Sequence, residues 1–493
     1  MTLSRRRMLG LVGAGTLAGV AAATVPGCSL LGSGTPQPTL LPSTAPLPKA
    51  FSVPLPVPPV ARPARTDPTT DYYELTQRPA RSRILPGLET PIWGYDGRFP
   101  GPTIRASRGR RTVVRVVNEL TVPTVTHLHG GRTPPDSDGY PTHLVEPRAA
   151  REYEFPLDQR AATLWYHDHR MDYTGHQVWR GLAGFFLVTD PEEDALGLPR
   201  GQRDIPLLIC DRSFAEDGTM PYPGYPDRPG VREGYRGGLL GDVVLVNGAP
   251  WPELRVARAR YRFRILNGSN ARAYELGLSG ERPFVRIASD GGLLTTPQRI
   301  TSLRLAPAER AEIVVDFSDI RAGEGIELRN LIGEGSVARV MRFAVDGGKV
   351  RDDARVPSRL SRIEPLDPGR AAVTRDFDFT SGDLHGGVGW LINGKPFDTE
   401  RIDASPRLGD VEIWRLRSDV AHPVHLHLAH FQVLSVDGGR VEGPPVWKDT
   451  VELRDNQIVE IITRFTGYRG RYVLHCHNLE HEDMMMMANF EVI

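Results

Sequence analysis

The chain has 493 residues, including 51 Gly and 43 Pro, and 24% of its residues are charged. Lys plus Arg and Asp plus Glu each number 60, so the formal net charge is zero and no basic face for nucleic acid is indicated. This length predicts about three domains, and the high Gly and Pro content favours a turn-rich, all-β protein.

The N-terminal 28 residues have the composition of an export segment. Arg5, Arg6 and Arg7 form a basic start, and a Gly- and Ala-rich apolar run follows over residues 9–25. This pattern is typical of a twin-arginine signal, a route that exports folded proteins. The alternative is a membrane anchor helix, although the run is shorter than the ~20 residues that a span needs. We therefore expect a periplasmic, cell-surface or secreted protein.

The end of this segment, Val25-Pro26-Gly27-Cys28, resembles a lipoprotein box. It predicts a lipid anchor at Cys28, although Pro26 departs from the usual pattern. The alternative is cleavage near residues 21–23, which leaves Cys28 as a free thiol, an uncommon feature in an exported protein. The other cysteines are Cys476 and Cys210, the latter in an apolar run that predicts a buried strand, so no disulfide framework is available.

The rest of the chain divides by composition. Residues 29–66 are rich in Pro, Ser and Thr and lack periodicity, which predicts a linker. Short β-rich runs bounded by turn residues then predict three β-sandwich domains, over residues 67–192, 200–345 and 371–493, with a charged connector over 346–370. Strands are expected at residues 72–75, 112–117, 205–210, 243–248, 261–267, 311–317, 390–394 and 411–416.

Histidine is concentrated in four motifs of the first and third predicted domains, and the second contains none. Ten of the 14 histidines lie in these motifs: His127 and His129; His167 and His169; His422, His425 and His427; His475, His477 and His481. Clustered imidazoles are costly to bury when charged, whereas a bound metal ion keeps them neutral. One pair alone is compatible with chance or with a zinc site, but the four together are hard to explain without bound metal.

Strand geometry sorts these residues, because successive side chains of a strand point to opposite faces. Each His-x-His pair then presents two imidazoles on one face, and four pairs place eight imidazoles in one cavity between the first and third domains. His422 has the opposite parity to His425, so it can face Cys476 and His481. Two imidazoles, one thiolate and a weak axial Met make a blue-copper electron-transfer site.

The stretch from His475 to Met487, interpreted as a strand running into a loop, resembles the last copper motif of multicopper oxidases of the bacterial laccase type. Trp447-Lys448-Asp449 and His481-Glu482-Asp483 extend the resemblance, and residues 93–104 resemble the opening strands of the family's first domain. The resemblance implies three cupredoxin-like Greek-key β-sandwich domains.

The resemblance also implies four copper ions. Type 1 copper would be bound by His422, Cys476, His481 and Met486, and type 2 copper by His127 and His425. The two type 3 ions would be bound by His129, His167, His169, His427, His475 and His477.

The implied reaction is the one-electron oxidation of phenolic or related organic substrates, coupled to four-electron reduction of O2 to water. Electrons would pass from the substrate near His481 through Cys476 to the cluster. Asp138 and Glu482 match the acidic residues that the family uses to supply protons, although either could simply be a solvated loop carboxylate.

Three alternatives stay open. A metal-ion oxidase acting on Cu(I), Mn(II) or Fe(II) in metal homeostasis has the same copper chemistry, but the Met cluster here lies inside the copper motif and not in a Met-rich insertion. A non-enzymatic cupredoxin relative would lack the ligands that this chain retains. A two-domain copper nitrite reductase would be shorter. The expected partners are O2 and a small reductant.

Overall fold

The computed structural model describes residues 35–225, 228–348, 350–384 and 387–493. The predicted export segment over 1–28, including Cys28, therefore lies outside the described residues, as does His385. Strands dominate the described chain, which confirms the all-β prediction. Within the described residues, no helix combines the length and apolarity needed to cross a bilayer.

The first pair of sheets is built from residues 65–189. In one sheet the first long strand, β3, pairs in parallel with β6. Its strands, in spatial order, are β2 (Arg65–Thr66), β3 (Thr70–Ser82), β6 (Arg111–Asn118) and β8 (Ala150–Phe155), with β4 (Thr90–Tyr95) beside β3. The other sheet contains β5 (Gly101–Ser107), β10 (Ala183–Thr189), β9 (Ala162–Asp168) and β7 (Thr126–His129).

The second pair of sheets comes from residues 204–345, and its first strand, β11, again pairs in parallel, with β16. One sheet contains β14 (Ala249–Pro250), β13 (Val243–Val246), β11 (Asp204–Arg212), β16 (Arg260–Asn267), β21 (Arg310–Asp316), β18 (Phe284–Ser289) and β19 (Gly292–Ile300). The other contains β15 (Glu253–Val256), β23 (Arg339–Val345), β22 (Gly325–Asn330), β17 (Tyr274–Leu278) and β20 (Ser302–Leu305). Cys210 is fully buried in β11, as predicted.

The third pair of sheets comes from residues 371–492, and its first strand, β24, pairs in parallel with β26, so the same arrangement occurs in all three pairs. One sheet contains β25 (Gly387–Ile392), β24 (Ala371–Leu384), β26 (Val411–Ser418), β31 (Ile458–Arg464), β28 (Phe431–Val436) and β29 (Gly439–Arg440). The other contains β30 (Thr450–Leu453), β27 (His422–Leu426), β32 (Gly470–Cys476) and β33 (Met487–Val492).

The helices are short and lie in the connections between strands. The α-helices are α1 (Thr174–Arg180), α2 (Pro191–Ala195) and α3 (Leu479–Asp483). The 3-10 turns are η1 (Pro135–Ser137), η2 (Gly201–Arg203), η3 (Glu233–Tyr235), η4 (Ser279–Glu281), η5 (Gly335–Ala338) and η6 (Pro368–Arg370).

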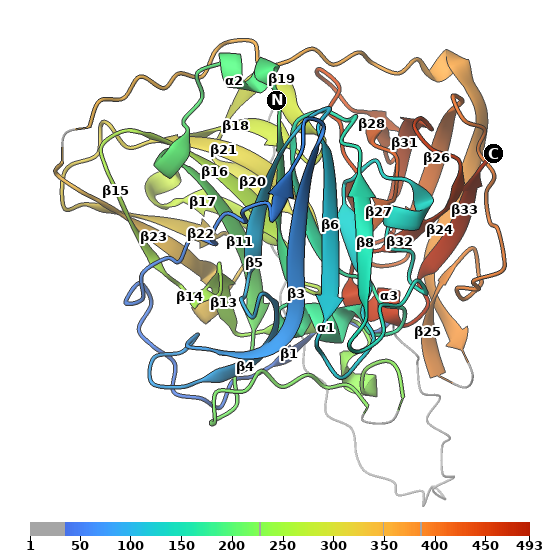
Figure 1. Cartoon of the computed structure of the whole chain (residues 1–493), viewed down its shortest axis with the longest axis horizontal. Helices are drawn as coiled ribbons and strands as arrows, with labels where there is room; N and C mark the ends of the chain where they lie inside the picture. The colour runs from blue at the N-terminus through green and yellow to red at the C-terminus, as the bar shows by residue number, and fades with distance from the viewer. Residues whose placement is uncertain (1–34, 226–227, 349, 385–386) are drawn as a thin grey trace, which may run out of the picture. The chain divides into compact units, whose positions relative to one another are not determined.

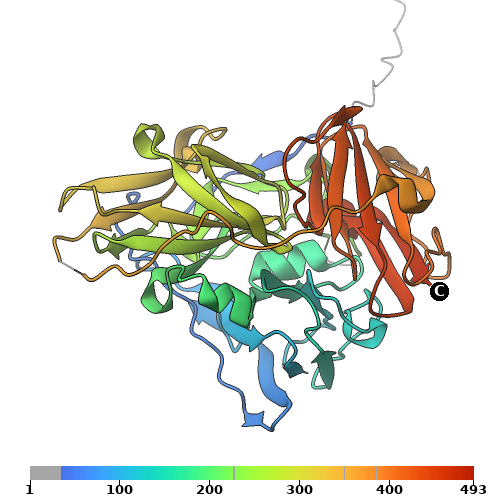
Figure 2. The same cartoon turned by 90° about the horizontal axis from the view of Figure 1, so that it is seen from above.

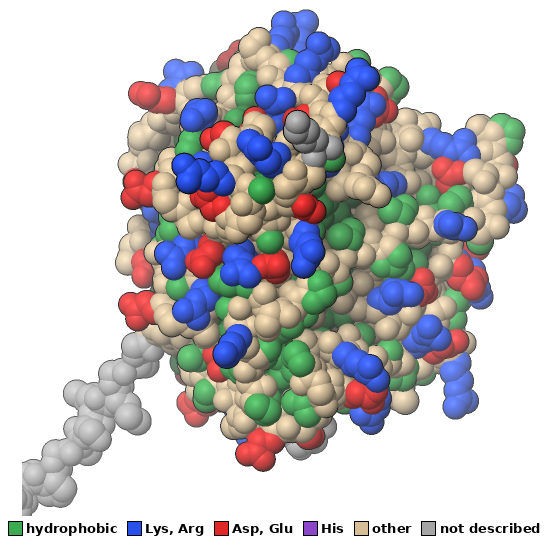
Figure 3. Space-filling view, turned by 90° about the vertical axis from the view of Figure 1, so that its left-hand side faces the viewer, with side chains coloured by type: hydrophobic (Ala, Val, Ile, Leu, Met, Phe, Trp, Pro, Cys, Tyr) green, Lys and Arg blue, Asp and Glu red, His purple; other side chains and the backbone are tan. Residues whose placement is uncertain are grey.

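The three sheet pairs lie side by side, and the connector over residues 346–370 runs across from the second to the third (Figures 1 and 2). Helices α1 and α3, far apart in the sequence, lie next to each other at the base of the first and third pairs (Figure 1). Basic and acidic side chains are interspersed over the face shown in Figure 3, in keeping with a formal net charge of zero.

The prediction of a linker over residues 29–66 is wrong for its described part. Strand β1 (Thr39–Leu41) pairs in parallel with β12 (Leu239–Gly241), and isolated bridges join Pro54 to Glu253 and Val60 to Thr103. Ala45 and Leu55 are buried in the core shared by the first two sheet pairs. The segment has no hydrophobic periodicity because it lies in an extended form along neighbouring strands. Single apolar side chains pack into the core there, and backbone groups form hydrogen bonds with those strands.

The sandwich interior explains most strands, but β16 is buried on both faces. Tyr261, Phe263 and Ile265 pack into the core, as their alternation predicts. On the opposite face, Arg262 and Arg264 are also buried, although such residues are usually exposed. They form ion pairs with carboxylates of the interface with the first sheet pair: Glu193, Asp204 and Glu312.

Candidate metal centre

The terminal motif folds as a strand, a single helical turn and a second strand. Cys476 ends β32, and the segment expected as a loop contains α3 instead. The turn reverses the chain: the backbone N–H groups of Met484 and Met486 donate to the carbonyl of His481, at 3.2 and 3.1 Å. The turn thereby brings His481 back to Cys476, whereas an extended loop would carry His481 away from it.

Three donor atoms converge at this reversal. The Sγ of Cys476 lies 3.5 Å from Nδ1 of His422 and 3.7 Å from Nδ1 of His481, and the two Nδ1 atoms are 3.1 Å apart. All three side chains are buried. Burial raises the pKa of the Cys476 thiol well above its usual value and lowers the pKa of the His481 imidazole. A buried thiol facing two imidazole nitrogens is the donor set of a blue-copper site. His422 faces Cys476 and His481, as its strand parity predicted.

The four consecutive methionines split between two cores. Met486 is fully buried in the core that contains Cys476, and Met484 packs against the same core. Met487 lies in a separate cluster with Tyr140, and Met485 packs against it. The turn that follows α3 therefore leaves Met486 as the fully buried thioether in the core that contains Cys476.

Eight further imidazoles gather where the first and third sheet pairs meet. They come from β7 and β9 of the first pair and from β27 and β32 of the third, or from the residues directly after these strands. Their donor atoms form groups within 4.8 Å of one another: His127, His129 and His425; His129, His167 and His477; His169, His427 and His475. Every one of these side chains is at most 1% exposed.

The unpaired nitrogens of this cluster test whether it suits metal ions. Among the described residues, Nε2 of His127, Nε2 of His167 and Nε2 of His425 are buried without a hydrogen-bond partner, as are Nδ1 of His129 and both nitrogens of His477. Buried polar atoms normally have partners. Nε2 of His475 lies 3.2 Å from Nε2 of His169 and of His427. Burial lowers the pKa of His127 and of His167 well below the usual value, so these rings are neutral. Neutral imidazoles with unpaired lone pairs directed at common points fit bound metal.

The opposite ring nitrogens are held by the protein. Nδ1 of His425 donates to the carbonyl of Asp449 at 2.8 Å, and Nδ1 of His167 donates to the carbonyl of Asp168 at 2.7 Å. Nδ1 of His127 donates to the carbonyl of Asp138. Such partners fix the tautomer and orientation of a metal-binding imidazole.

Asp138 and Glu482, the two predicted acids, are both buried beside the cluster, so the alternative of solvated loop carboxylates is wrong. Oδ2 of Asp138 lies 2.7 Å from Nδ1 of His427, and burial raises the pKa of Asp138 to about 8. Oε2 of Glu482 lies 3.2 Å from Nδ1 of His475. Burial opposes ionisation of Glu482, but His475 and His169 offset it and bring the pKa below its usual value.

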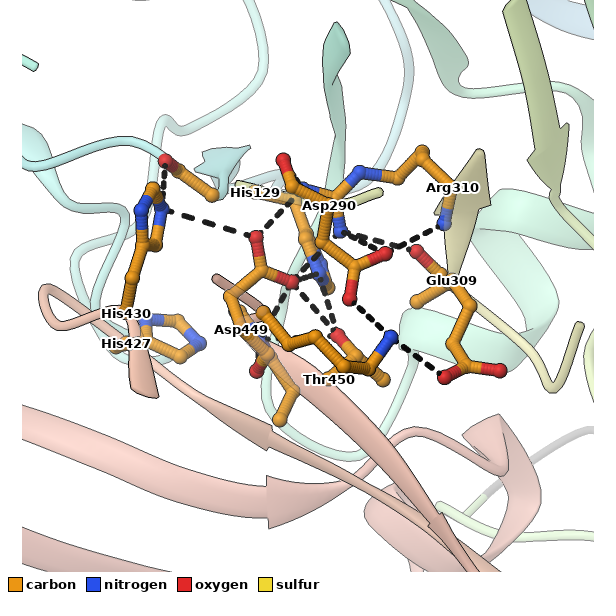
Figure 4. Close-up of polar contacts among 12 residues, drawn as sticks. His129, Asp290, Glu309, Arg310, His427, His430, Asp449 and Thr450 are labelled. Carbon is orange, nitrogen blue, oxygen red and sulfur yellow. Dashed lines mark hydrogen bonds and ion pairs between the residues drawn. The ribbon is translucent and has the colours of Figure 1, made fainter. Parts of the chain in front are cut away.

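Sequence reasoning missed a buried ion pair that holds the cluster from the second sheet pair (Figure 4). Arg310 begins β21, and its Nη1 and Nη2 lie 2.6 and 2.5 Å from the two carboxylate oxygens of Asp449. Oδ1 of Asp449 lies 3.2 Å from Nε2 of His129, and its backbone carbonyl accepts the bond from His425. Asp449 is the last residue of the Trp447-Lys448-Asp449 motif, to which the sequence alone assigned no function. No feature of the sequence indicated a role for Arg310.

Residues of the second domain also lie against the Cys476 group. The carbonyl of Gly237 lies 3.2 Å from Nε2 of His481. Glu480 of α3 accepts the N–H of Leu239 at 2.9 Å and the amide of Asn270 at 2.7 Å. A region without histidine therefore covers one group of donors and braces the other.

The remaining described histidines stand outside these groups. Nε2 of His430 donates to the carbonyl of Gly130 at 3.0 Å. The ring of His176 lies between Trp93 and Tyr222, and His143 contacts Tyr140.

Comparison with known proteins agrees with this geometry. Residues 78–193 and 368–493 each match a sequence model of the family described as multicopper oxidase. A laccase of Bacillus stratosphericus is 37% identical over 89% of this chain and 98% of its own length. A bilirubin oxidase of Albifimbria verrucaria is 37% identical over 89% of this chain and 81% of its own. The solved structure of a laccase from Pediococcus acidilactici has a TM-score of 0.80 and 33% identity, covering 93% of this chain and 96% of that one.

The chain belongs to the multicopper oxidase family. Its sheet pairs are therefore cupredoxin-like domains, and the family implies four copper ions in sites of types 1, 2 and 3. It is a copper-dependent oxidoreductase with O2 as electron acceptor, similar to laccases and to bilirubin oxidase.

Proposed function

We propose that this chain is a laccase-type oxidase that couples the one-electron oxidation of phenolic or related organic compounds to the four-electron reduction of O2 to water. One observation carries the proposal: two separate donor groups are joined by three consecutive residues. Cys476 belongs to the thiolate group, whereas His475 and His477, its covalent neighbours, belong to the imidazole cluster. One peptide unit on each side of Cys476 therefore connects a site for taking single electrons with a site large enough for several metal ions.

The ligand roles follow the family pattern. Bound copper supplies one-electron redox chemistry at the first group and O2 reduction at the second. His422, Cys476, His481 and Met486 would hold type 1 copper. His127 and His425 would hold type 2 copper. The type 3 pair would be held by His129, His167, His169, His427, His475 and His477, whose two convergent groups of three support this division.

The two buried carboxyl groups have different proton states. Asp138, with a pKa of about 8, carries a proton near neutral pH and presents Oδ2 to the His427 ring. Glu482, whose pKa is held below its usual value, stays ionised, and its Oε2 lies 3.2 Å from Nδ1 of His475. Water formation consumes protons, and one protonated and one ionised carboxyl beside the cluster can donate and receive them.

Two cavities beside α3 support organic reductants. Their volumes are about 290 and 220 Å³, and they share Asp172, Tyr225 and Asp483 in their linings. Tyr173 and Tyr222 add aromatic surface to the larger cavity. Aromatic walls suit flat phenolic compounds.

A metal-ion oxidase is the second candidate. The smaller cavity also contains Met484 and Met485 together with the carboxylates of Asp172 and Asp483. Thioethers suit Cu(I), and carboxylates suit Mn(II).

Copper analysis and oxygen uptake test these proposals together. We expect about four copper ions per chain, a blue absorption band and oxygen uptake with phenols or bilirubin exceeding that with Cu(I) or Mn(II). Cys476→Ser should abolish the blue band and substrate oxidation while most copper at the imidazole cluster stays bound. A colourless protein that stays free of copper after loading would contradict the enzyme assignment, and faster uptake with the metal ions would favour the second candidate.

We also propose export by the twin-arginine route with a lipid anchor at Cys28. The motif at Arg5 to Arg7 and the box ending at Cys28 support this proposal. Replacing Arg5 and Arg6 by Lys should retain the precursor inside the cell. Cys28→Ala should release exported protein from membranes, whereas unchanged fractionation would favour cleavage without lipid or an anchor helix.

A further inference from the structure

A cavity of about 390 Å³ is lined by residues of the first domain, the connector and the third domain. It shares no lining residue with the two cavities beside α3. Its volume is in the range of small-molecule sites. The side chains that give it chemical character are Arg132, Arg160, Arg370, Arg464, His430 and Trp447.

The cationic groups of this cavity have few counter-charges. Within the described chain, the side chains of Arg370 and Arg464 have no ion-pair or hydrogen-bond partner. Arg160 bonds only to neutral groups: the carbonyls of Leu293 and Arg362, at 2.9 and 3.0 Å, and the hydroxyl of Ser361 at 3.1 Å. Its Nε is buried without a partner. A half-buried guanidinium without a carboxylate is unusual, because buried charges are normally paired.

The carboxylates in the lining are already engaged elsewhere. Glu364 pairs with Arg362, outside the cavity, at 3.0 Å. Oδ1 of Asp367 accepts the backbone N–H of Gly369 at 2.9 Å. Arg132 has the carboxylate of Asp158 at 3.9 Å, longer than a hydrogen bond. The lining has four guanidinium groups against the two carboxylates of Glu364 and Asp367, so it carries a net positive charge, although the whole chain has none.

One wall is apolar and flat. Trp447 lines the cavity with Leu366, Val411 and Leu428. The carbonyl of Trp447 accepts the hydroxyl of Ser289 at 2.8 Å, so its backbone is fixed against the second domain. An indole beside guanidinium groups suits a ligand with an aromatic body and an acidic group.

His430 connects this cavity to the metal centre. Its ring lines the cavity, donates to the carbonyl of Gly130, next to His129, and lies 3.9 Å from Oδ2 of Asp449 (Figure 4). An occupant would thus lie one residue layer from the cluster.

We propose that this cavity binds a small aromatic carboxylate, with its acidic group between Arg370 and Arg464 and its ring against Trp447. The site is separate from the cleft for the reducing substrate. Because the first domain, the connector and the third domain all line it, an occupant joins the two domains that carry the imidazoles, and binding stabilises the folded protein.

Calorimetric titration of the copper-loaded protein with benzoate tests the proposal, with inorganic phosphate as a probe that lacks the ring. We expect saturable binding of benzoate, weaker binding of phosphate at the same site, and a higher melting temperature with benzoate. Arg370→Gln and Arg464→Gln should each weaken benzoate about ten-fold, the loss of one charged hydrogen bond. Trp447→Leu should weaken benzoate and leave phosphate unchanged.

Arg351→Gln is the matched control, since Arg351 is an exposed arginine of the same connector, as Arg370 is, but lies outside the cavity lining and pairs with Asp353. It should leave both affinities within about two-fold of the parent protein. Absence of saturable benzoate binding, or equal affinity in the parent and both cavity variants, would overturn the site. Tighter binding of phosphate than of benzoate would overturn the aromatic occupant.

Discussion

Arg310 braces the copper cluster from a domain that supplies no copper ligand, and its replacement by Met has a calculable cost. The guanidinium bonds to Asp449 of the third domain, the carbonyl of Thr163 of the first at 3.0 Å, and the carbonyl of Asp290 of its own domain at 3.2 Å. Arg310 and Asp449 are both essentially inaccessible to solvent. Met fills similar space but cannot replace any of these bonds.

Removing one partner of a buried ion pair costs about 3–5 kcal/mol, because it leaves an uncompensated charge. Three carbonyl groups, those of Thr163, Asp290 and Ala308, also lose a donor, so we expect Arg310→Met to lie at the upper end of this range. Asp449 contacts His129 and, through its carbonyl, His425. Loss of such a supporting group typically reduces metal affinity about 10- to 100-fold.

Chemical denaturation and copper titration measure the two effects separately. Arg304→Met is the matched control: Arg304 also joins the second domain to the third, through Glu452 at 2.6 Å, but it is 31% exposed. Its loss should cost about 1 kcal/mol or less and leave copper affinity unchanged. The double variant Arg310→Met with Asp449→Leu should cost less than the sum of the single variants, because the orphaned charge is removed. Equal destabilisation by Arg310→Met and Arg304→Met, or unchanged copper affinity in Arg310→Met, would refute the argument.

Three further predictions concern other parts of the chain. Met486→Leu should keep the blue colour, raise the type 1 reduction potential and cost less than about 1.5 kcal/mol of stability, since Leu and Met side chains have similar volumes. Redox titration of Leu variants at the four methionines should show the largest change in potential at Met486. A larger change at Met484, Met485 or Met487 would disprove the assignment. Leu55→Ala should destabilise the protein by about 2–3 kcal/mol, because Leu55 is buried. Leu40, in the same N-terminal segment, is 49% exposed, so Leu40→Ala should change the stability by no more than about 0.5 kcal/mol. Equal effects of the two changes in denaturation would mean that this segment is a free linker. Burial raises the pKa of Asp204, but Arg264 and Arg262 more than offset this and hold the pKa below its usual value in an unfolded chain. The stabilising contribution of Asp204 is therefore complete above that usual value and is lost as the pH falls through the lower folded pKa. Asp204→Asn should be less stable at neutral pH and lose less stability on acidification, which melting curves from about pH 7 to pH 2 can check.

The sequence predicted the strands well where one face is apolar. The runs at 72–75, 112–117 and 411–416 all lie inside observed strands, because alternation follows directly from the pleat of a strand. It failed for the described part of residues 29–66, because an extended segment that docks on other strands needs no periodicity of its own. It also gave no indication that the polar face of β16 is buried, since Arg262 and Arg264 find their carboxylates on other elements.

For the metal centre, residue type and spacing were enough to indicate the donors. The imidazoles and the thiol are adjacent in short motifs, so strand parity sorts them before any fold is known. What only the tertiary structure decided is how those motifs are held together. Arg310, Gly237 and Glu480 act on residues more than a hundred positions away, and no local pattern records such contacts. The sequence by itself therefore determined which groups can bind copper. The packing of three domains determined the hydrogen-bond partners, the proton states and the burial of those groups, because all three depend on side chains and charges contributed by distant parts of the chain.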